Sequence, residues 1–176
     1  MIRTNDQVEM DGLRRVAELM CVAARTAPKA RGADQIVTAI IEEMQDRERI
    51  AQRMEEIGER AEAEFFLRDA RNLREAPIAV MLGTSLRRLR IPGCSFCGYP
   101  GCDAADEADA RCAYNAGDLG IAIGSAVSVA ADHRVDNRIM YTMGNAAVEL
   151  ELLGPDVKIA HGIPLSAKGK NPFFDR

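Results

Sequence analysis

The sequence predicts a domain of mixed helices and strands, in which helices pack against a central sheet. Its 176 residues are enough for one hydrophobic core. Segments with the hydrophobic spacing of a helix alternate with short runs rich in β-branched residues. This alternation is typical of α/β or α+β domains, so we predict a single domain over residues 1–176.

The composition excludes several classes of protein. Hydrophobic residues make up 47% of the chain and charged residues 28%, and the net charge is −4. Charges of both signs are mixed, so the basic stripe of a nucleic-acid-binding surface is missing. No apolar run reaches the roughly 18 residues of a membrane span, and residues 1–6 lack the apolar segment of a signal peptide. We therefore expect a cytoplasmic protein that binds neither nucleic acid nor membrane.

Residues 1–76 alternate between helical and strand patterns. Apolar residues recur at helical spacing from Leu13 to Ala27 and stop at Pro28, which predicts a first helix. The β-branched run over 35–42 predicts a buried strand. Two further helices are predicted over residues 45–63 and 64–76. The core candidates of the second of these are Phe65, Phe66, Ala70 and Leu73.

Residues 77–164 contain the most apolar part of the chain. Residues 115–132 predict a helix whose glycines and alanines let a neighbour approach closely, so we expect it to be buried on most sides. That neighbour is another helix, a second subunit or a cofactor. The other elements are predicted as strands over 78–83, 136–141 and 157–164 and a helix over 144–153.

A cysteine-rich loop over residues 92–112 is the predicted functional centre. It holds four of the five cysteines, Cys94, Cys97, Cys102 and Cys112. Glycines and prolines lie among the first three of these cysteines, which predicts a tight loop that is neither helix nor strand. Such a loop can turn several thiolates toward one point, as an iron–sulfur cluster or a structural zinc ion requires. In a reducing compartment, clustered cysteines favour metal or redox chemistry over disulfides.

The cysteine spacing favours an iron–sulfur cluster and leaves zinc open. Structural zinc usually takes two close pairs of ligands, whereas here the pair of Cys94 and Cys97 is followed by two single cysteines. The spacing also differs from the usual ferredoxin patterns. Four free or redox-active thiols are a third and less favoured reading, because the turn residues suit a cage. Cys21 lies in a helical stripe, and we expect it to be a small buried residue.

The residues around the cysteines predict the surroundings of such a centre. We expect Phe96, Tyr99 and Pro100 to shield it from water. Carboxylates between Cys102 and Cys112 would lower the potential of an anionic cluster, although a solvated loop or helix face is the simpler reading of each. The two histidines, His133 and His161, accompany no catalytic motif, so we expect structural or surface roles for them.

Several segments together resemble a family of bacterial and archaeal proteins that are described only as containing a ferredoxin domain. They are the cysteine loop and residues 24–30, 68–70, 118–126, 135–138, 162–166 and 170–176. The resemblance spans nearly the whole chain. It implies a 4Fe-4S cluster on Cys94, Cys97, Cys102 and Cys112, and hence electron transfer, but no particular reaction, substrate or redox partner.

A second resemblance is to the fold of the flavin-dependent nitroreductases. Residues 23–28 are similar to a segment of that family in which an Ala-Pro turn precedes flavin contacts. The helix from Asp118 resembles that fold's central helix, and the basic tail resembles its phosphate-binding segment. The resemblance implies a nitroreductase-like fold and FMN as a cofactor. By position, its flavin or phosphate contacts would be Arg25, Lys29, Lys168 and Lys170.

Two functions of different kinds therefore stand as hypotheses. In the first, the protein is a 4Fe-4S redox protein, a nitroreductase-like oxidoreductase linked to a flavin. We expect that protein to be a homodimer that exchanges electrons with a separate redox partner. In the second, it is a non-catalytic binding module whose four cysteines hold zinc or a cluster for structure alone.

Overall fold

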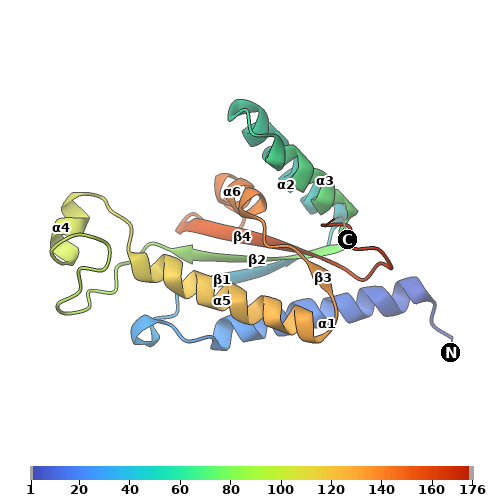
Figure 1. The fold of residues 1–176 in the computed structure, drawn as a ribbon, viewed down its shortest axis with the longest axis horizontal. Helices are drawn as coiled ribbons and strands as arrows, with labels where there is room; N and C mark the ends of the chain where they lie inside the picture. The colour runs from blue at the N-terminus through green and yellow to red at the C-terminus, as the bar shows by residue number, and fades with distance from the viewer. Residues whose placement is uncertain (1, 175–176) are drawn as a thin grey trace.

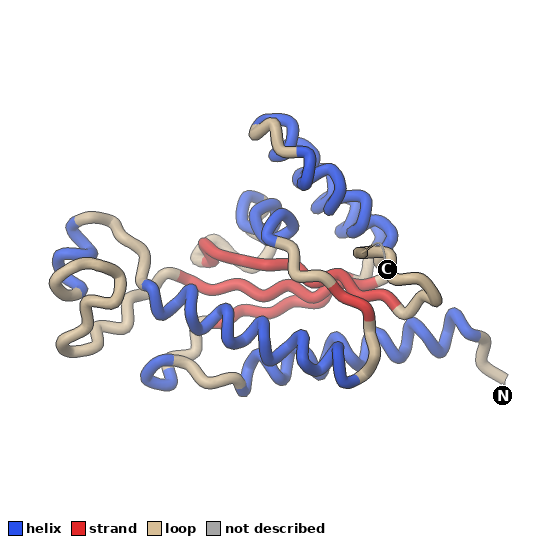
Figure 2. Tube along the Cα trace, viewed as in Figure 1, coloured by secondary structure: helices blue, strands red, loops and turns tan. Residues whose placement is uncertain are grey.

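The computed structural model describes residues 2–174, and a four-stranded sheet lies at their centre with helices on both faces (Figures 1 and 2). All neighbouring strands are antiparallel, so the predicted mixed class is confirmed in its α+β form. No helix within residues 2–174 is long and apolar enough to cross a membrane. In sheet order the strands are β1 (Ile36–Ile41), β2 (Ile78–Ser85), β4 (Val157–Ser166) and β3 (Asp136–Asn137).

Two long helices, α1 (Asn5–Thr26) and α5 (Ala113–Asp132), cover one face of the sheet. The apolar stripe predicted for the first helix is the buried side of α1, and the helix ends just before Pro28. That stripe packs with α5 onto alternate residues of β2, including Val80 and Leu82, which are fully buried. Because β-strand side chains alternate between faces, the residues between them point to the other side.

Three helices cover the opposite face: α2 (Met44–Arg60), α3 (Glu64–Glu75) and α6 (Tyr141–Glu149). Met81 of β2 is buried on this side together with residues of all three helices. Helix α6 lies so close to β4 that a Cβ atom at Gly144 would be 1.8 Å from the carbonyl oxygen of Ala160. Only glycine fits at this contact, so α6 is fixed tightly against the sheet.

Three expectations about individual elements are wrong in part. The strand over 35–42 forms as β1, but it is an edge strand in which only Ile36 is buried. Phe65 is exposed on α3 rather than buried in the core. The strand over 136–141 is only two residues long, because Tyr141 already begins α6. The hydroxyl of Thr142 in that first turn donates to the buried carboxylate of Asp69 at 2.8 Å, a tertiary contact that the local pattern does not reveal.

Helix α5 is buried on one side only. Leu119, Ala122 and Ala126 face the sheet and are buried as expected, whereas its opposite side is exposed. The exposed side carries Gly117, Gly120, Ile121 and Gly124. A Cβ atom added at any of these glycines would meet nothing within 4 Å. Contacts within the described chain therefore do not account for them, and the expectation of burial on most sides is wrong.

Candidate functional site

The cysteine-rich loop projects from one end of the sheet, together with the short helix α4 (Cys102–Glu107) (Figure 1). We call residues 86–112 the cysteine arm. The arm leaves β2 after Ser85 and returns to the body at Ala113, the first residue of α5. Its base is thus set by a central strand and by a helix that packs on the same sheet.

Buried hydrogen bonds fix the base of the arm. Asn115 of α5 is 2% exposed, and its side-chain amide donates to the carbonyl oxygens of Ser85 and Arg87, each at 3.0 Å. The side chain of Gln35 donates to the same carbonyl oxygen of Arg87 at 2.9 Å and accepts a hydrogen bond from the hydroxyl of Ser85 at 2.7 Å. The two ends of the arm are therefore held together irrespective of what lies between them.

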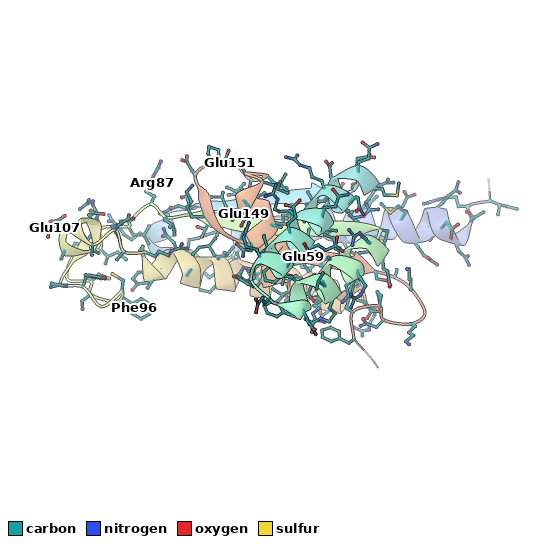
Figure 3. All side chains as sticks on the ribbon, turned by 90° about the horizontal axis from the view of Figure 1, so that it is seen from above. Glu59, Arg87, Phe96, Glu107, Glu149 and Glu151 are labelled. Atoms are coloured by element: carbon teal, nitrogen blue, oxygen red, sulfur yellow. The ribbon has the colours of Figure 1, made fainter. Side chains whose placement is uncertain are left out.

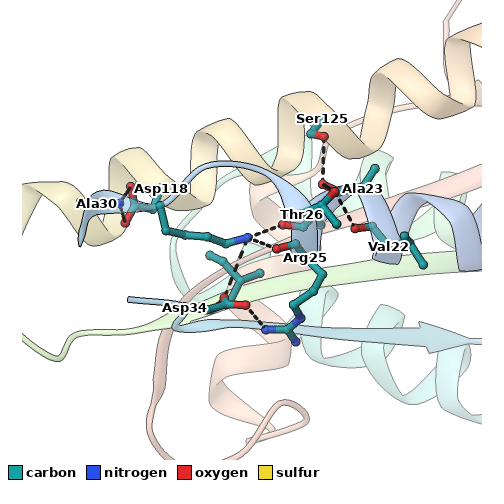
Figure 4. Close-up of polar contacts among 11 residues, drawn as sticks. Val22, Ala23, Arg25, Thr26, Ala30, Asp34, Asp118 and Ser125 are labelled. Atoms are coloured by element: carbon teal, nitrogen blue, oxygen red, sulfur yellow. Dashed lines mark hydrogen bonds and ion pairs between the residues drawn. The ribbon is translucent and has the colours of Figure 1, made fainter. Parts of the chain in front are cut away.

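The turn after α1 also lies against the base of the arm. Both carboxylate oxygens of Asp118 accept a hydrogen bond from the backbone N–H of Ala30 at 3.1 Å (Figure 4). The guanidinium of Arg31, the next residue, donates to the carbonyl oxygen of Leu89 at 2.9 Å. Asp118 thus connects the helix that follows the arm to the turn that supports the arm's first residues.

Ion pairs attach α4 to the first half of the arm. Arg88 pairs with Asp106 and donates to the carbonyl oxygen of Ala105 at 2.6 Å. Arg90 pairs with Asp106 and with Asp103, the latter at 2.7 Å. The hydrogen bond from Arg88 lowers the pKa of the Asp106 carboxyl below its ordinary value. These two acids are therefore neutralised by arginines, so they add less negative charge near the cysteines than the sequence suggested.

Tight turns place two of the cysteines beside one hollow. Gly93 and Gly101, with φ angles of +72° and +98°, directly precede Cys94 and Cys102. This left-handed region is one that residues with a side chain rarely adopt, so the turns depend on glycine. Cys94 and Cys102 both line a hollow of about 470 Å³ between the turns. The predicted tight loop is confirmed up to Cys102, where α4 begins.

The other two cysteines lie outside the lining of this hollow. Cys97 is half-buried within the arm, and Cys112 is buried at the start of α5. All five cysteines are free thiols. Within residues 2–174, no three or more His, Cys, Asp or Glu side chains come together as a metal site. The arm thus supplies the right donor atoms, two of them at one hollow, and the set Cys94, Cys97, Cys102 and Cys112 stays a prediction.

The aromatic residues of the arm do not enclose the hollow. Phe96 is 70% exposed, and its ring lies against Tyr114 with 5.2 Å between the ring centroids. Figure 3 shows Phe96 at the surface of the arm, on the side opposite Arg87. Pro100 is exposed as well, while Tyr99 is half-buried. Phe96 and Tyr99 therefore lie outside the lining of this hollow, whereas Pro100 is part of it, and a shielding role for the three residues stays a prediction.

The first pair of predicted flavin contacts has partners within the chain. Arg25 forms an ion pair with Asp34 (Figure 4). The ammonium of Lys29 donates to the carbonyl oxygens of Ala24, at 2.8 Å, and of Arg25, and its side chain is only 5% exposed. Lysine in this position satisfies the last carbonyl groups of α1, so Lys29 has a structural role in this chain.

The second pair lies at the other end of the sheet. The ammonium of Lys168 donates to the carbonyl oxygen of Glu75 at 3.2 Å, just before β2, and Lys170 is exposed in the tail that follows β4. Arg25 and Lys29 lie beyond the opposite end of β2. Eight residues of β2 separate the two pairs by roughly 25 Å. Within one chain, the four residues therefore do not meet at one flavin. Asp175 and Arg176, which end the tail, lie outside the described residues.

The polar residues that position the arm were not identified from the sequence. Asn115 and Asp118 are the strongest omissions, because both are buried polar residues on an apolar helix. Their signal was present, since a polar side chain on the buried side of a helix needs a hydrogen-bond partner. Gln35 and Arg31 carried no such signal, because each lies in a polar turn.

Comparisons with known proteins identify the family. Residues 108–176 match a family described as uncharacterised proteins containing a ferredoxin domain. A protein of Archaeoglobus fulgidus, named only as an uncharacterised protein, is 37% identical over 184 residues, which cover all of this chain and 98% of that protein. The chain belongs to this ferredoxin-domain family. The matched residues of the family begin inside the arm, so they include Cys112 and all of α5.

Solved structures similar to this member of the ferredoxin-domain family are described as nitroreductases and NAD(P)H oxidoreductases. A nitroreductase family protein from Clostridium novyi has a TM-score of 0.61 and 12% identity, and the match covers 88% of this chain and 74% of that one. The NADPH:FMN oxidoreductase of Vibrio harveyi, solved with NAD⁺, has a TM-score of 0.58 and 12% identity over 92% of this chain and 63% of its own. At these identities the likeness shows the fold alone, so the predicted nitroreductase-like fold is confirmed.

Proposed function

We propose that this protein is a redox protein whose cysteine arm binds a 4Fe-4S cluster through Cys94, Cys97, Cys102 and Cys112. The observation that carries the proposal is that four free thiols lie on one glycine-turned arm that is anchored at both ends. The description of the family as ferredoxin-containing and the nitroreductase-like fold both support a redox role. In this proposal, residues 1–176 act as one domain and residues 92–112 are its metal-binding loop.

A bound cluster supplies one-electron transfer, and the chain's own residues prepare its site. Asn115 and Gln35 hold the base of the arm at a fixed distance from the sheet. Arg88 and Arg90 cancel the charge of the nearby acids, which limits the repulsion of an anionic cluster. Cys112 sits at the N-terminus of the 20-residue helix α5, where the helix dipole favours negative charge. A reducing, cytoplasmic location would keep these thiols available.

We further propose a homodimer that forms through the exposed side of α5. Within residues 113–131 the only charged residue is Asp118, which is buried against Ala30, so the exposed side carries no charge. A second copy that packs there would account for the exposed glycines, because the lack of a side chain allows close approach of two helices. If the two copies run in opposite directions, Arg25 of one copy comes near Lys168 and Lys170 of the other. An FMN that uses Arg25 of one copy and Lys168 and Lys170 of the other would therefore bind between the two copies.

Anaerobic purification followed by iron, zinc and acid-labile sulfide analysis tests the cluster. We expect brown protein with iron and sulfide, and visible absorption that dithionite bleaches. Cys97→Ser should lose most of the iron, whereas Cys21→Ser, which changes a half-buried cysteine on α1, should keep it. Colourless protein with one zinc per chain would instead support the non-catalytic binding module, with zinc held for structure.

The dimer and the flavin have a separate test. Gly120→Arg places a charge on the exposed side of α5, where an added Cβ atom meets nothing within 4 Å in the described chain. We expect sedimentation to show a monomer, with FMN lost and iron retained. A Gly120→Arg variant that stays dimeric and keeps its flavin would contradict the interface and leave the cluster proposal intact.

A further inference from the structure

A second and larger hollow lies between the cysteine arm and the body. Its volume is about 740 Å³. Arg87 near the start of the arm, Arg111 near its end, Val148 of α6 and Lys158 of β4 all line it. Three separate parts of the chain thus surround one space, and the hollow is concave rather than a flat patch. Figure 3 shows Arg87 on the side of the arm away from Phe96.

The lining of this hollow is strongly basic. It contains five arginine or lysine side chains and two aspartates, a net charge of +3 in a chain whose net charge is −4. Arg88 and Arg90 are already paired with Asp106, as described above. This basic lining stands out in a protein with an excess of acidic residues. Cations that surround one space repel each other, and an anion bound between them relieves that repulsion.

Three of these cations have no partner among the residues that the structure describes. Among residues 2–174, the side chains of Arg87, Arg111 and Lys158 form no hydrogen bond or ion pair. Asp109 also lines the hollow, and its negative charge reduces the sum of the three positive charges by one without pairing with any of them. Two guanidinium groups and an ammonium remain able to donate hydrogen bonds into the space. Guanidinium groups bind phosphate through two parallel N–H···O bonds, and an ammonium adds a point charge.

The size and the remaining lining indicate a small molecule rather than a bare ion. Ligand sites commonly have volumes of about 300–1,000 Å³, and this hollow lies within that range. Leu86, Ala110 and Val148 add apolar surface to the lining, on which an uncharged part of a ligand can pack. The combination of cations and apolar surface matches a molecule with a phosphate group at one end and an uncharged part at the other.

We propose that the hollow between the cysteine arm and β4 binds a phosphate-bearing small molecule of nucleotide size, with Arg87, Arg111 and Lys158 as the phosphate ligands. Arg111 directly precedes Cys112, so the bound molecule lies beside the proposed cluster. The site itself does not depend on the cluster. Calorimetry with the full-length, anaerobically purified protein tests it, with pyrophosphate, ADP and adenosine as probes.

We expect saturable binding of one ADP per chain, weaker binding of pyrophosphate and no binding of adenosine. Arg111→Gln and Lys158→Gln should each weaken ADP binding at least about tenfold, as expected for the loss of a hydrogen bond to a charged group. Arg49→Gln is the matched control, since Arg49 is exposed on α2 and lines none of these hollows. The three substituted residues, Arg49, Arg111 and Lys158, are all exposed, so each variant should keep the wild-type melting temperature.

Two results would overturn the proposal. One is equal affinity for ADP in the wild type and in the Lys158→Gln and Arg111→Gln variants. The other is binding of adenosine as tight as that of ADP, because the phosphate would then not be recognised. If a poly-glutamate peptide binds while ADP and pyrophosphate do not, the hollow contacts an acidic protein and the small-molecule site is refuted.

Discussion

The cysteine arm and the rest of the molecule are stabilised by different kinds of interaction. The body, residues 2–85 and 113–174, buries one apolar cluster on each face of its sheet. The arm has few buried apolar residues, such as Leu89 and Ala105, and relies on hydrogen bonds and ion pairs. A large buried apolar side chain stabilises a fold by about 1.5–3 kcal/mol, whereas an exposed ion pair contributes roughly 0–1 kcal/mol. The body thus sets the stability, and the arm is the part that a bound ligand can reshape.

The largest expected effect is in the body, at the contact between α6 and β4. In Gly144→Ala, the added Cβ atom would lie 1.8 Å from the carbonyl oxygen of Ala160, which is backbone and cannot move aside. We expect the free energy of unfolding to fall by about 3 kcal/mol, as in other overpacked cores. Urea denaturation measures this loss.

Gly12→Ala on the exposed side of α1 is the matched control. A Cβ atom there meets nothing within 4 Å. Alanine favours a helix over glycine by up to about 1 kcal/mol, so this variant should be slightly more stable than the wild type. Equal effects of the two substitutions would show that α6 does not pack against β4 as closely as described.

A middle-sized effect is expected where the arm joins the body. Asn115→Ala leaves the carbonyl oxygens of Ser85 and Arg87 without their donor from α5. An unsatisfied buried polar group costs about 1–3 kcal/mol, and amide exchange within the arm should become faster. Asn145→Ala is the control, because its bond to Tyr141 is exposed. If arm exchange is unchanged in Asn115→Ala, the arm does not depend on this anchor.

The smallest expected effect is a difference between the body and the arm in how their stability depends on pH. Burial lowers the pKa of His161 in the body below 6.5, and its ring Nδ1 has no hydrogen-bond partner among residues 2–174. As the pH falls, His161 is therefore protonated in the unfolded state before it is protonated in the folded state. The free energy of unfolding decreases as the pH falls below about 6.5. Asp106 in the arm has a lowered pKa, so its ion pair with Arg88 persists until the pH falls below 3.8, its ordinary value.

Denaturation at a series of pH values checks this difference. We expect His161→Gln to lose less stability than the wild type between neutral and mildly acid pH, while the two proteins show the same amide exchange in the arm. A wild type whose stability is constant over that range would contradict the role of His161.

Local patterns predicted most of the body. Helical spacing located α1, α2 and α3, because each of these helices buries one side against the sheet. A β-branched run located β1, and short apolar segments located β2 and β4. The start of α6 was misplaced, since it depends on the hydrogen bond between Thr142 and a residue 73 positions away.

The site was less predictable than the fold. The cysteines were found because their residue type and spacing carry the signal. The basic residues Arg25 and Lys168 were grouped by resemblance, but which end of the sheet each occupies depends on strand order, which no local pattern encodes. The anchoring role of Asn115 likewise depends on which chain segment folds against it.

Both ends of the arm join parts of the body that do not need the arm in order to pack. Strand β2 and helix α5 lie in the same apolar cluster, and Asn115 closes the gap between them. The 27 residues from 86 to 112 therefore form a long connection between two elements that already pack in the same cluster. If the arm binds the proposed cluster, the body of newly made protein can fold while the thiols are still bare, and iron and sulfide can be delivered to the arm afterwards. Cells starved of iron would then accumulate a stable, colourless precursor that is ready to mature when the metal returns.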